Sequence, residues 1–157
     1  MLPAAALVLL AGVVGARLGL PPVQEDEGVP VVRVVDGDTI RVGMKGRDVA
    51  VRYIGVNTPE SVDRRRPVER LGKEAAQRNR ELVEGKRVQL EKDVSETDRF
   101  GRLLRYVYRL EGRMVNALLV EEGYARASSY PPDVKYQELF RRLEREAREK
   151  KRGLWAD

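Results

Sequence analysis

The chain has 157 residues, with 30 Lys and Arg against 25 Asp and Glu, and it contains neither Cys nor His. The length predicts one domain with a hydrophobic core of ordinary size. The lack of Cys and His excludes disulfides, thiolate or imidazole zinc sites, and every mechanism that uses an imidazole base. The modest positive charge fits a polyanionic partner or an anionic membrane surface, but a solvated basic surface would explain it too.

The first 16 residues differ in composition from the rest of the chain. They carry no charged side chain, and small residues at 14–16 follow an apolar centre at 7–10. This pattern predicts a signal peptide, cleaved or kept as an N-terminal anchor, because a membrane span needs about 20 apolar residues. A misplaced start codon is the alternative. We expect a secreted or extracytoplasmic protein, membrane-anchored if the leader is uncleaved, with residues 17–28 as a linker.

The next part of the chain alternates apolar and polar residues in short runs. These runs predict strands at 31–35, 39–44 and 48–56. Asp36-Gly37 between the first two favours a type I′ hairpin turn, in which Gly adopts positive φ. Asp38 follows this turn, which has no need of its carboxylate, and Arg52 lies within the third strand.

The second half of the chain predicts three helices and two strands. Apolar residues at helical spacing, each run followed by Gly, indicate helices at 69–84, 114–122 and 134–151. Alternating runs indicate strands at 87–92 and 103–110. This order of elements predicts an α+β domain over residues 29–157 that is built on a Greek-key barrel.

Several polar residues lie where the strand pattern does not require them. They are Asp38, Arg52, the segment Asn57-Thr58-Pro59-Glu60 and the segment Thr97-Asp98-Arg99-Phe100-Gly101-Arg102. Each alone has a structural explanation, such as an ordinary turn or an arginine stem that covers apolar surface. Together they suit phosphodiester chemistry, in which a cation held by oxygen ligands and two guanidiniums neutralise the transition-state charge.

The order and spacing of these motifs, with Asp36-Gly37-Asp38-Thr39 first, resemble the staphylococcal nuclease (thermonuclease) family. The resemblance covers about residues 31–155 and continues to Gly153-Leu154-Trp155. It implies a five-stranded OB-fold barrel with three α-helices. It also implies Ca²⁺-dependent, sequence-nonspecific hydrolysis of DNA and RNA that leaves 3′-phosphate ends.

The resemblance implies three sets of site residues. The Ca²⁺ ligands would be Asp38, Asn57 and the backbone carbonyl of Thr58. Glu60 would act as general base or orient the attacking water, and the arginines that grip the phosphate would be Arg52 and Arg102. The nucleic-acid contacts would be Arg99, Phe100 and Tyr130, although Tyr130 packed against its own turn is an equal alternative.

The chain departs from the family pattern at three positions. Asn57 stands where the best-known member has an Asp ligand, so we expect a higher Ca²⁺ requirement because the amide brings no charge. Phe100 stands for a Tyr, and its ring can still stack on a base. Arg99 stands for a Lys.

Two other functions compete with the nuclease hypothesis. One is a non-catalytic OB-fold barrel that binds nucleic acid through its basic surface and aromatic rings. The other is a membrane-anchored barrel that serves as a protein-interaction module. A pure binder does not need Asp38, Arg52, Glu60 and Arg102 at catalytic spacing, which favours the nuclease. No sequence feature indicates an oligomer, so we expect a monomer.

Overall fold

A computed structural model of the chain describes residues 27–61 and 69–156. The predicted leader at 1–16 and nearly all of the predicted linker lie outside these described residues. Within them, no helix is both long enough and apolar enough to cross a bilayer.

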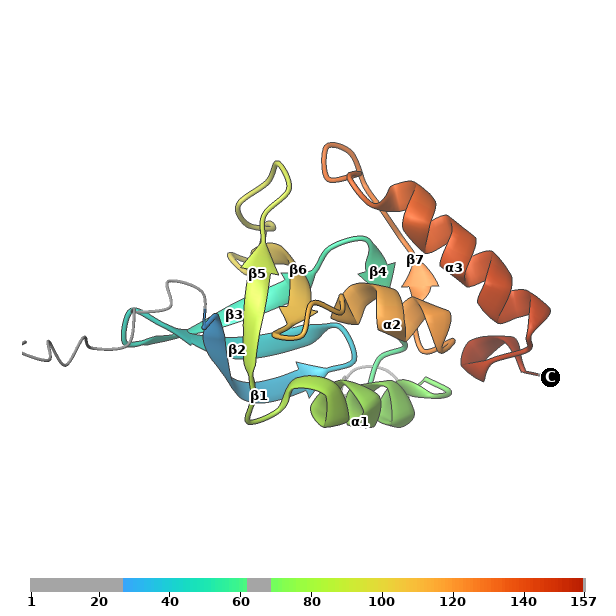
Figure 1. The fold of residues 1–157 in the computed structure, drawn as a ribbon, viewed down its shortest axis with the longest axis horizontal. Helices are drawn as coiled ribbons and strands as arrows, with labels where there is room; N and C mark the ends of the chain where they lie inside the picture. Colours follow the sequence, from blue (N-terminus) through green and yellow to red (C-terminus); the bar gives the residue numbers. More distant parts are fainter. Residues whose placement is uncertain (1–26, 62–68, 157) are drawn as a thin grey trace, which may run out of the picture.

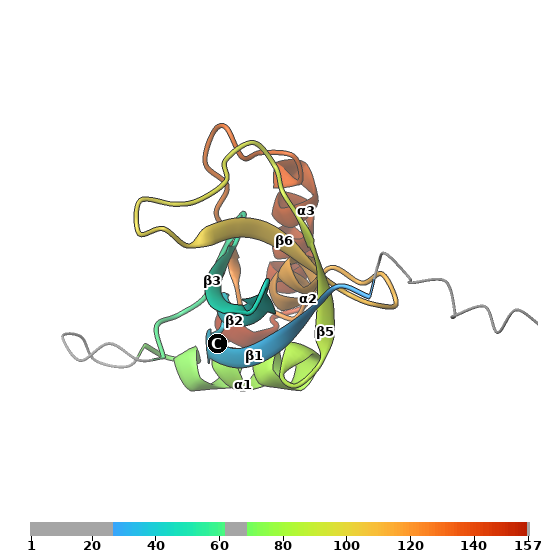
Figure 2. The ribbon, with the colours of Figure 1, turned by 90° about the vertical axis from the view of Figure 1, so that its left-hand side faces the viewer.

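Five strands close into a barrel with the order β1-β2-β3-β6-β5 (Figure 1, Figure 2). The β3–β6 pair is parallel, and the other pairs are antiparallel. The strands are β1 (Val29–Asp36), β2 (Thr39–Met44), β3 (Arg47–Tyr53), β5 (Arg87–Glu91) and β6 (Leu103–Arg109). The α+β, OB-fold class predicted from the sequence is therefore confirmed.

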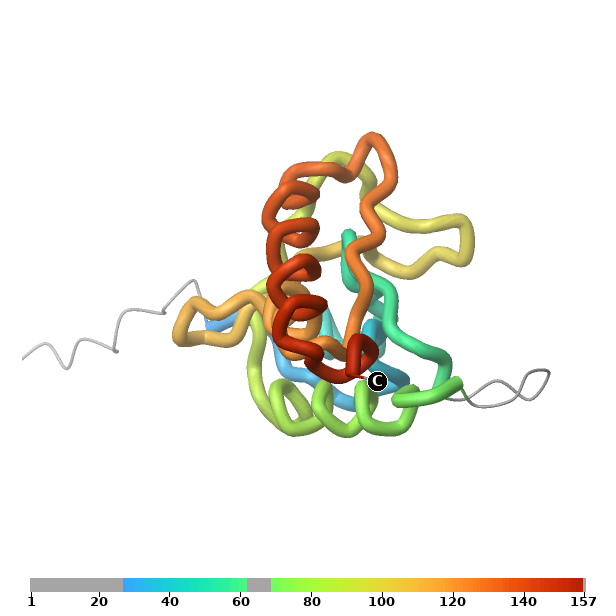
Figure 3. The backbone as a smooth tube through the Cα atoms, turned by 90° about the vertical axis from the view of Figure 1, so that its right-hand side faces the viewer, coloured from blue at the N-terminus to red at the C-terminus, as the bar shows by residue number. Residues whose placement is uncertain are grey.

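Three α-helices accompany the barrel among the described residues, which is the number that the sequence predicted. The first, α1, lies along the outside of β1, while α3 runs beside the end of the barrel on the far side of α2 (Figure 1, Figure 3). Their bounds are α1 (Gly72–Val83), α2 (Val115–Glu121) and α3 (Gln137–Glu149), and a 3₁₀ turn, η1 (Gly153–Trp155), follows. The Leu154 backbone N–H donates to the Gly123 carbonyl at 2.8 Å, and Gly153 packs against the Gly123 backbone. These contacts join η1 to the segment that follows the end of α2.

Alternation along β2 and β3 divides their residues between the core and the outer face. Ile40, Val42, Val51 and Tyr53 point inward and are almost fully buried. Because successive strand residues face opposite sides, Arg52 lies on the outer face of β3, directly opposite Thr39 of β2. The core pattern therefore determines that the Arg52 guanidinium meets the surface rather than the core.

The predicted third strand is wrong in its length. β3 ends at Tyr53, and a separate short strand, β4 (Val56–Asn57), pairs with β7 (Arg126–Ala127). Gly55 causes the break: its φ is +77°, and an added Cβ would lie 2.5 Å from the ring of Phe140. The chain therefore leaves the barrel before it reaches Asn57.

The type I′ turn expected after β1 is also wrong. Asp36 pairs with Thr39, so the two turn residues are Gly37 and Asp38, and Gly37 does not have positive φ. Gly37 is needed instead for space, because an added Cβ would lie 2.6 Å from Oγ1 of Thr58 and 2.8 Å from its Cβ. The missing side chain lets the β1–β2 turn touch the segment that follows β4.

Candidate active site

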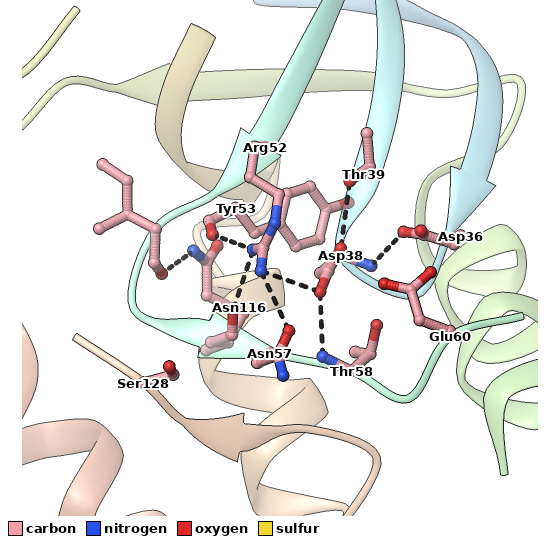
Figure 4. Close-up of polar contacts among 12 residues, drawn as sticks. Asp36, Asp38, Thr39, Arg52, Tyr53, Asn57, Thr58, Glu60, Asn116 and Ser128 are labelled. Carbon is pink, nitrogen blue, oxygen red and sulfur yellow. Dashed lines mark hydrogen bonds and ion pairs between the residues drawn. The ribbon is translucent and has the colours of Figure 1, made fainter. Parts of the chain in front are cut away.

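Asp38 lies at the centre of the candidate site, in the turn before β2. Its side chain is only 7% exposed. One carboxylate oxygen accepts a hydrogen bond from the Thr58 backbone N–H at 2.9 Å, and the other accepts one from Thr39 Oγ1 at 3.1 Å. The ion pair with Arg52, at 3.1 Å, compensates its charge (Figure 4).

Arg52 is held in place by backbone carbonyls as well as by Asp38. Its Nη1 donates to the carbonyls of Tyr53 and Val56 at 2.6 and 2.9 Å. The turn that presents these carbonyls is supported from below by the buried Asn116, whose amide donates to the Ile54 carbonyl at 2.9 Å. The guanidinium is therefore oriented before any ligand arrives.

Asn57, at the end of β4, and Thr58, which follows it, lie beside the ion pair of Arg52 and Asp38 (Figure 4). The Asn57 amide oxygen accepts a hydrogen bond from Arg52 Nη2 at 3.3 Å, and Asn57 is solvent-exposed. Thr58 is buried, and its backbone N–H binds Asp38. The three residues predicted as Ca²⁺ ligands are thus neighbours, although Asp38 lies 20 residues before Thr58 in the sequence.

Two more carboxyl groups adjoin Asp38. The carboxylate of Glu60 points toward Asp36 and Asp38 (Figure 4). Burial, together with the negative charges of Asp38 and Glu60, raises the pKa of Asp36 to about 7. Negative charge is therefore concentrated here, which is the condition that favours a bound cation.

The second side of the site is the loop between β5 and β6. Asp98 accepts hydrogen bonds from the backbone N–H groups of Phe100 and Arg102, at 2.9 and 3.0 Å, and its ion pair with Arg102 Nε measures 2.7 Å. Phe100 is 69% exposed, and the guanidinium carbons of Arg99 and Arg102 lie 4.8 and 5.4 Å from the centre of its ring. Asp98 therefore shapes the loop and orients Arg102 at once.

A cleft of about 680 Å³ joins the two sides of the site. Its lining includes all the predicted phosphate and base contacts, namely Arg52, Arg99, Phe100, Arg102 and Tyr130. The Tyr130 ring is 73% exposed, and its hydroxyl lies 3.3 Å from Ser128 Oγ. Asp38, Asn57, Thr58 and Glu60 do not line this cleft, but Arg52, which does, contacts Asp38 and Asn57.

Several residues that support the site were not predicted from the sequence. Asn79 donates from its amide to the Asp36 carbonyl at 2.9 Å and accepts from the Tyr53 hydroxyl at 2.7 Å. The buried Asp133 accepts from the backbone N–H groups of Val94 and Ser95, which ties the β5–β6 loop to the segment before α3. A polar residue on the apolar face of a predicted helix was the available signal for Asn79.

Comparisons with known proteins identify the family of the chain. Residues 50–157 match the family model described as "Staphylococcal nuclease homologue". The chain is 42% identical to "Thermonuclease" of Staphylococcus hyicus over 81% of this chain and 75% of the relative, and 43% identical to "Thermonuclease" of Staphylococcus intermedius over 82% and 76%. It belongs to the staphylococcal nuclease family.

Another relative of this family member comes from Bacillus subtilis. It is "Endonuclease YncB", which is 42% identical over 82% of this chain and 61% of its own length. The residues that match the family model begin within β3, so they include β4 and the β5–β6 loop.

The residues of the site offer oxygen atoms, which are the ligands that a hard cation prefers. Among the described residues, no group of three or more acidic, His or Cys side chains is arranged as a ready-made metal site. Ca²⁺ nevertheless accepts amide and backbone carbonyl oxygens together with carboxylates. The donor set of Asp38, Asn57 and the Thr58 carbonyl fits this preference but supplies only one charged ligand.

Proposed function

We propose that this family member is a Ca²⁺-dependent nuclease that hydrolyses DNA and RNA without sequence preference and leaves 3′-phosphate ends. The observation that carries the proposal is the position of Arg52. It lines the cleft together with Arg102, and it contacts both Asp38 and Asn57. One guanidinium thus links the arginine-lined cleft to the candidate metal ligands.

The two arginines would bind the phosphate being cleaved. Arg52 keeps its orientation because two carbonyls and Asp38 hold it. Asp98 engages Arg102 through Nε, so its terminal nitrogens are the ones that would meet the phosphate oxygens. Guanidiniums match phosphate in geometry and stabilise the charge that develops on its oxygens.

Glu60 would orient the attacking water and take its proton on a carboxylate oxygen. Its direction toward Asp36 and Asp38 places it beside the candidate metal ligands (Figure 4).

The metal ligands would be Asp38, the Thr58 carbonyl and the Asn57 amide oxygen. Ca²⁺, when bound, would polarise the phosphate and offset its negative charge. Because Asn57 adds no charge, we expect activity to require more Ca²⁺ than a site with two ligand carboxylates.

The partner would be single-stranded or locally opened nucleic acid. Phe100 and Tyr130 expose their rings at the cleft, where bases can stack, and Arg99 adds positive charge beside Phe100. The apolar residues 1–16 support export to a secreted or extracytoplasmic location, with membrane anchoring if the leader stays uncleaved.

The test is cleavage of single-stranded DNA by the purified chain over a Ca²⁺ series, with a chelator control. Glu60→Gln should lower kcat by roughly 10²-fold or more. The matched control is Glu74→Gln, an exposed acid on α1, which should cleave like the wild type. Products should resist polymerase extension until a phosphatase removes the 3′-phosphate. Cleavage that persists in chelator would contradict the metal dependence.

A binding protein without activity is the second candidate. It is favoured by the uncharged Asn57 and by the lack, among residues 27–61 and 69–156, of a three-acid metal cluster. In that case the same assay would show DNA binding but no cleavage at any Ca²⁺ concentration.

A further inference from the structure

The chain leaves the candidate site at Glu60 and returns beside it at Glu69. The backbone N–H of Glu69 donates to the Glu60 carbonyl at 3.1 Å. In return, the Glu69 carboxylate accepts a hydrogen bond from the Glu60 backbone N–H at 3.2 Å. A single residue therefore binds both polar groups of the Glu60 backbone, and we call this pair of bonds the Glu60–Glu69 clasp.

The clasp is connected to the start of α1. The Glu69 carbonyl accepts from the Gly72 N–H at 3.0 Å. Gly72 also packs directly on Glu60, since an added Cβ would lie 2.2 Å from the Glu60 carbonyl oxygen. Leu71, between them, has φ +64°, an uncommon backbone conformation for a residue other than Gly. The backbone bends at Leu71, and this bend brings Gly72, the first residue of α1, into contact with the Glu60 backbone.

The other end of this connection is the β1–β2 turn. From the third turn of α1, Asn79 donates to the Asp36 carbonyl and accepts from the Tyr53 hydroxyl. Helix α1 consequently contacts both segments that carry the acidic groups of the site: the turn with Asp36 and Asp38, and the segment with Glu60. The clasp holds the Glu60 backbone against the start of α1.

We infer that Glu69 is a positioning residue for Glu60. Its carboxylate orients the Glu60 peptide, so that the Glu60 side chain is directed at the attacking water. Glu69 itself touches neither substrate nor metal. This inference rests on the proposed function, in which Glu60 activates that water. A general base must lie within hydrogen-bond distance of the proton it takes, so a small rotation of its backbone lowers the rate.

A purely structural role for Glu69 predicts different behaviour. If the clasp only stabilises the fold, its loss should lower Tm without changing kcat at a temperature where the variant is folded. If it positions Glu60, its loss should lower kcat while KM changes little, because binding of the phosphate depends on Arg52 and Arg102. The conservative variant Glu69→Gln keeps an acceptor oxygen and should restore the rate, since the negative charge is not the essential property.

The experiment measures kcat and KM of the full chain for Ca²⁺-dependent cleavage of a short single-stranded DNA. We expect Glu69→Ala to lower kcat about tenfold and to change KM less than about twofold, and Glu69→Gln to stay within about threefold of the wild type. Glu74→Ala, which removes another exposed acid near the start of α1, is the matched control and should leave both constants unchanged.

A double-mutant cycle shows whether Glu69 acts through Glu60. In the Glu60→Gln background, Glu69→Ala should cause no further loss of kcat. Additive losses would overturn the inference, as would equal rates for Glu69→Ala and the wild type, or equal losses in Glu69→Ala and Glu69→Gln. An inactive wild type would refute the proposed function and this inference together, whereas an active wild type with an unaffected Glu69→Ala would refute this inference alone.

Discussion

The two sides of the candidate site are built differently. On the barrel side, Arg52 and Asp38 are held by strand backbone and by each other, and both are largely buried. On the loop side, Arg102 and the exposed Phe100 depend on one carboxylate, Asp98. The barrel side is preorganised by the fold, while the loop side is organised by a local turn. Substitutions on the barrel side should therefore lower both stability and activity, whereas substitutions on the loop side should lower mainly activity.

The largest difference should appear when each arginine is replaced by Ala. Arg52→Ala should lower kcat/KM on the order of 10³-fold. It should also lower the free energy of unfolding by about 3 kcal/mol, because the buried Asp38 carboxylate loses its cation. Arg102→Ala should lower kcat/KM about 10²-fold and the free energy of unfolding by less than about 1 kcal/mol.

Steady-state kinetics and denaturant unfolding of the two arginine variants test this difference. Arg145→Ala, an exposed arginine on α3, controls for the loss of one positive charge. Equal loss of stability in Arg52→Ala and Arg102→Ala would show that the two sides are equally integrated with the core.

The next effect concerns the close approach of the β1–β2 turn to Thr58. Gly37→Ala should lower the free energy of unfolding by about 2 kcal/mol, since its Cβ would overlap the Thr58 side chain. Gly43→Ala on β2 is the control, because its nearest neighbour would be the Pro30 Cγ at 3.3 Å. Urea unfolding of both variants measures the difference. Similar midpoints would mean that the turn and Thr58 move apart at little cost.

A smaller effect is expected for the anchor of the loop side. Burial raises the pKa of Asp98, but hydrogen bonds from Arg102 and Phe100 outweigh burial and leave the pKa below its ordinary value of 3.8. A depressed folded-state pKa means that the carboxylate contributes stability above about pH 4, and that this contribution is lost as the pH falls through the folded-state pKa.

Asp98→Asn should therefore lower the free energy of unfolding by about 1 kcal/mol at neutral pH. The gap between wild type and variant should shrink toward zero as the pH is lowered through the acidic range. We expect kcat/KM to fall roughly tenfold, because Arg102 loses its orientation. Unfolding measured at a series of pH values provides the check, and a gap that widens in acid would contradict the stated sign.

The smallest effect should follow from removal of the exposed ring. Phe100→Ala should raise KM for single-stranded DNA about fivefold, as expected for one stacked base, and leave Tm unchanged. Phe100→Tyr should behave like the wild type or bind slightly better. Fluorescence titration with a labelled oligonucleotide measures the affinity of each variant. Unchanged affinity in Phe100→Ala would show that the ring does not contribute to binding.

Much of the fold was predictable from periodicity. The predicted strand at 39–44 coincides with β2, and the strands at 87–92 and 103–110 end one residue later than observed. The predicted start of α1 is three residues early because the clasp occupies Glu69. The predicted start of α3 is also three residues early, because hydrogen bonds to Asp133 and Asp93 hold the preceding segment in a loop. These contacts are made with distant residues, which no local pattern reveals.

The candidate site divides in the same way. The sequence by itself determined the types and spacing of Asp38, Arg52, Glu60 and Arg102, because the chemistry of phosphate limits which residues can serve. Only the tertiary structure decided how they are held. Arg52 is held by backbone carbonyls on either side of Gly55, which has positive φ. Thr58 contacts the β1–β2 turn because Gly37 has no side chain. Glu60 is joined to the start of α1 through Glu69. Each of these contacts depends on backbone groups brought together by folding, and backbone groups are the same in every sequence.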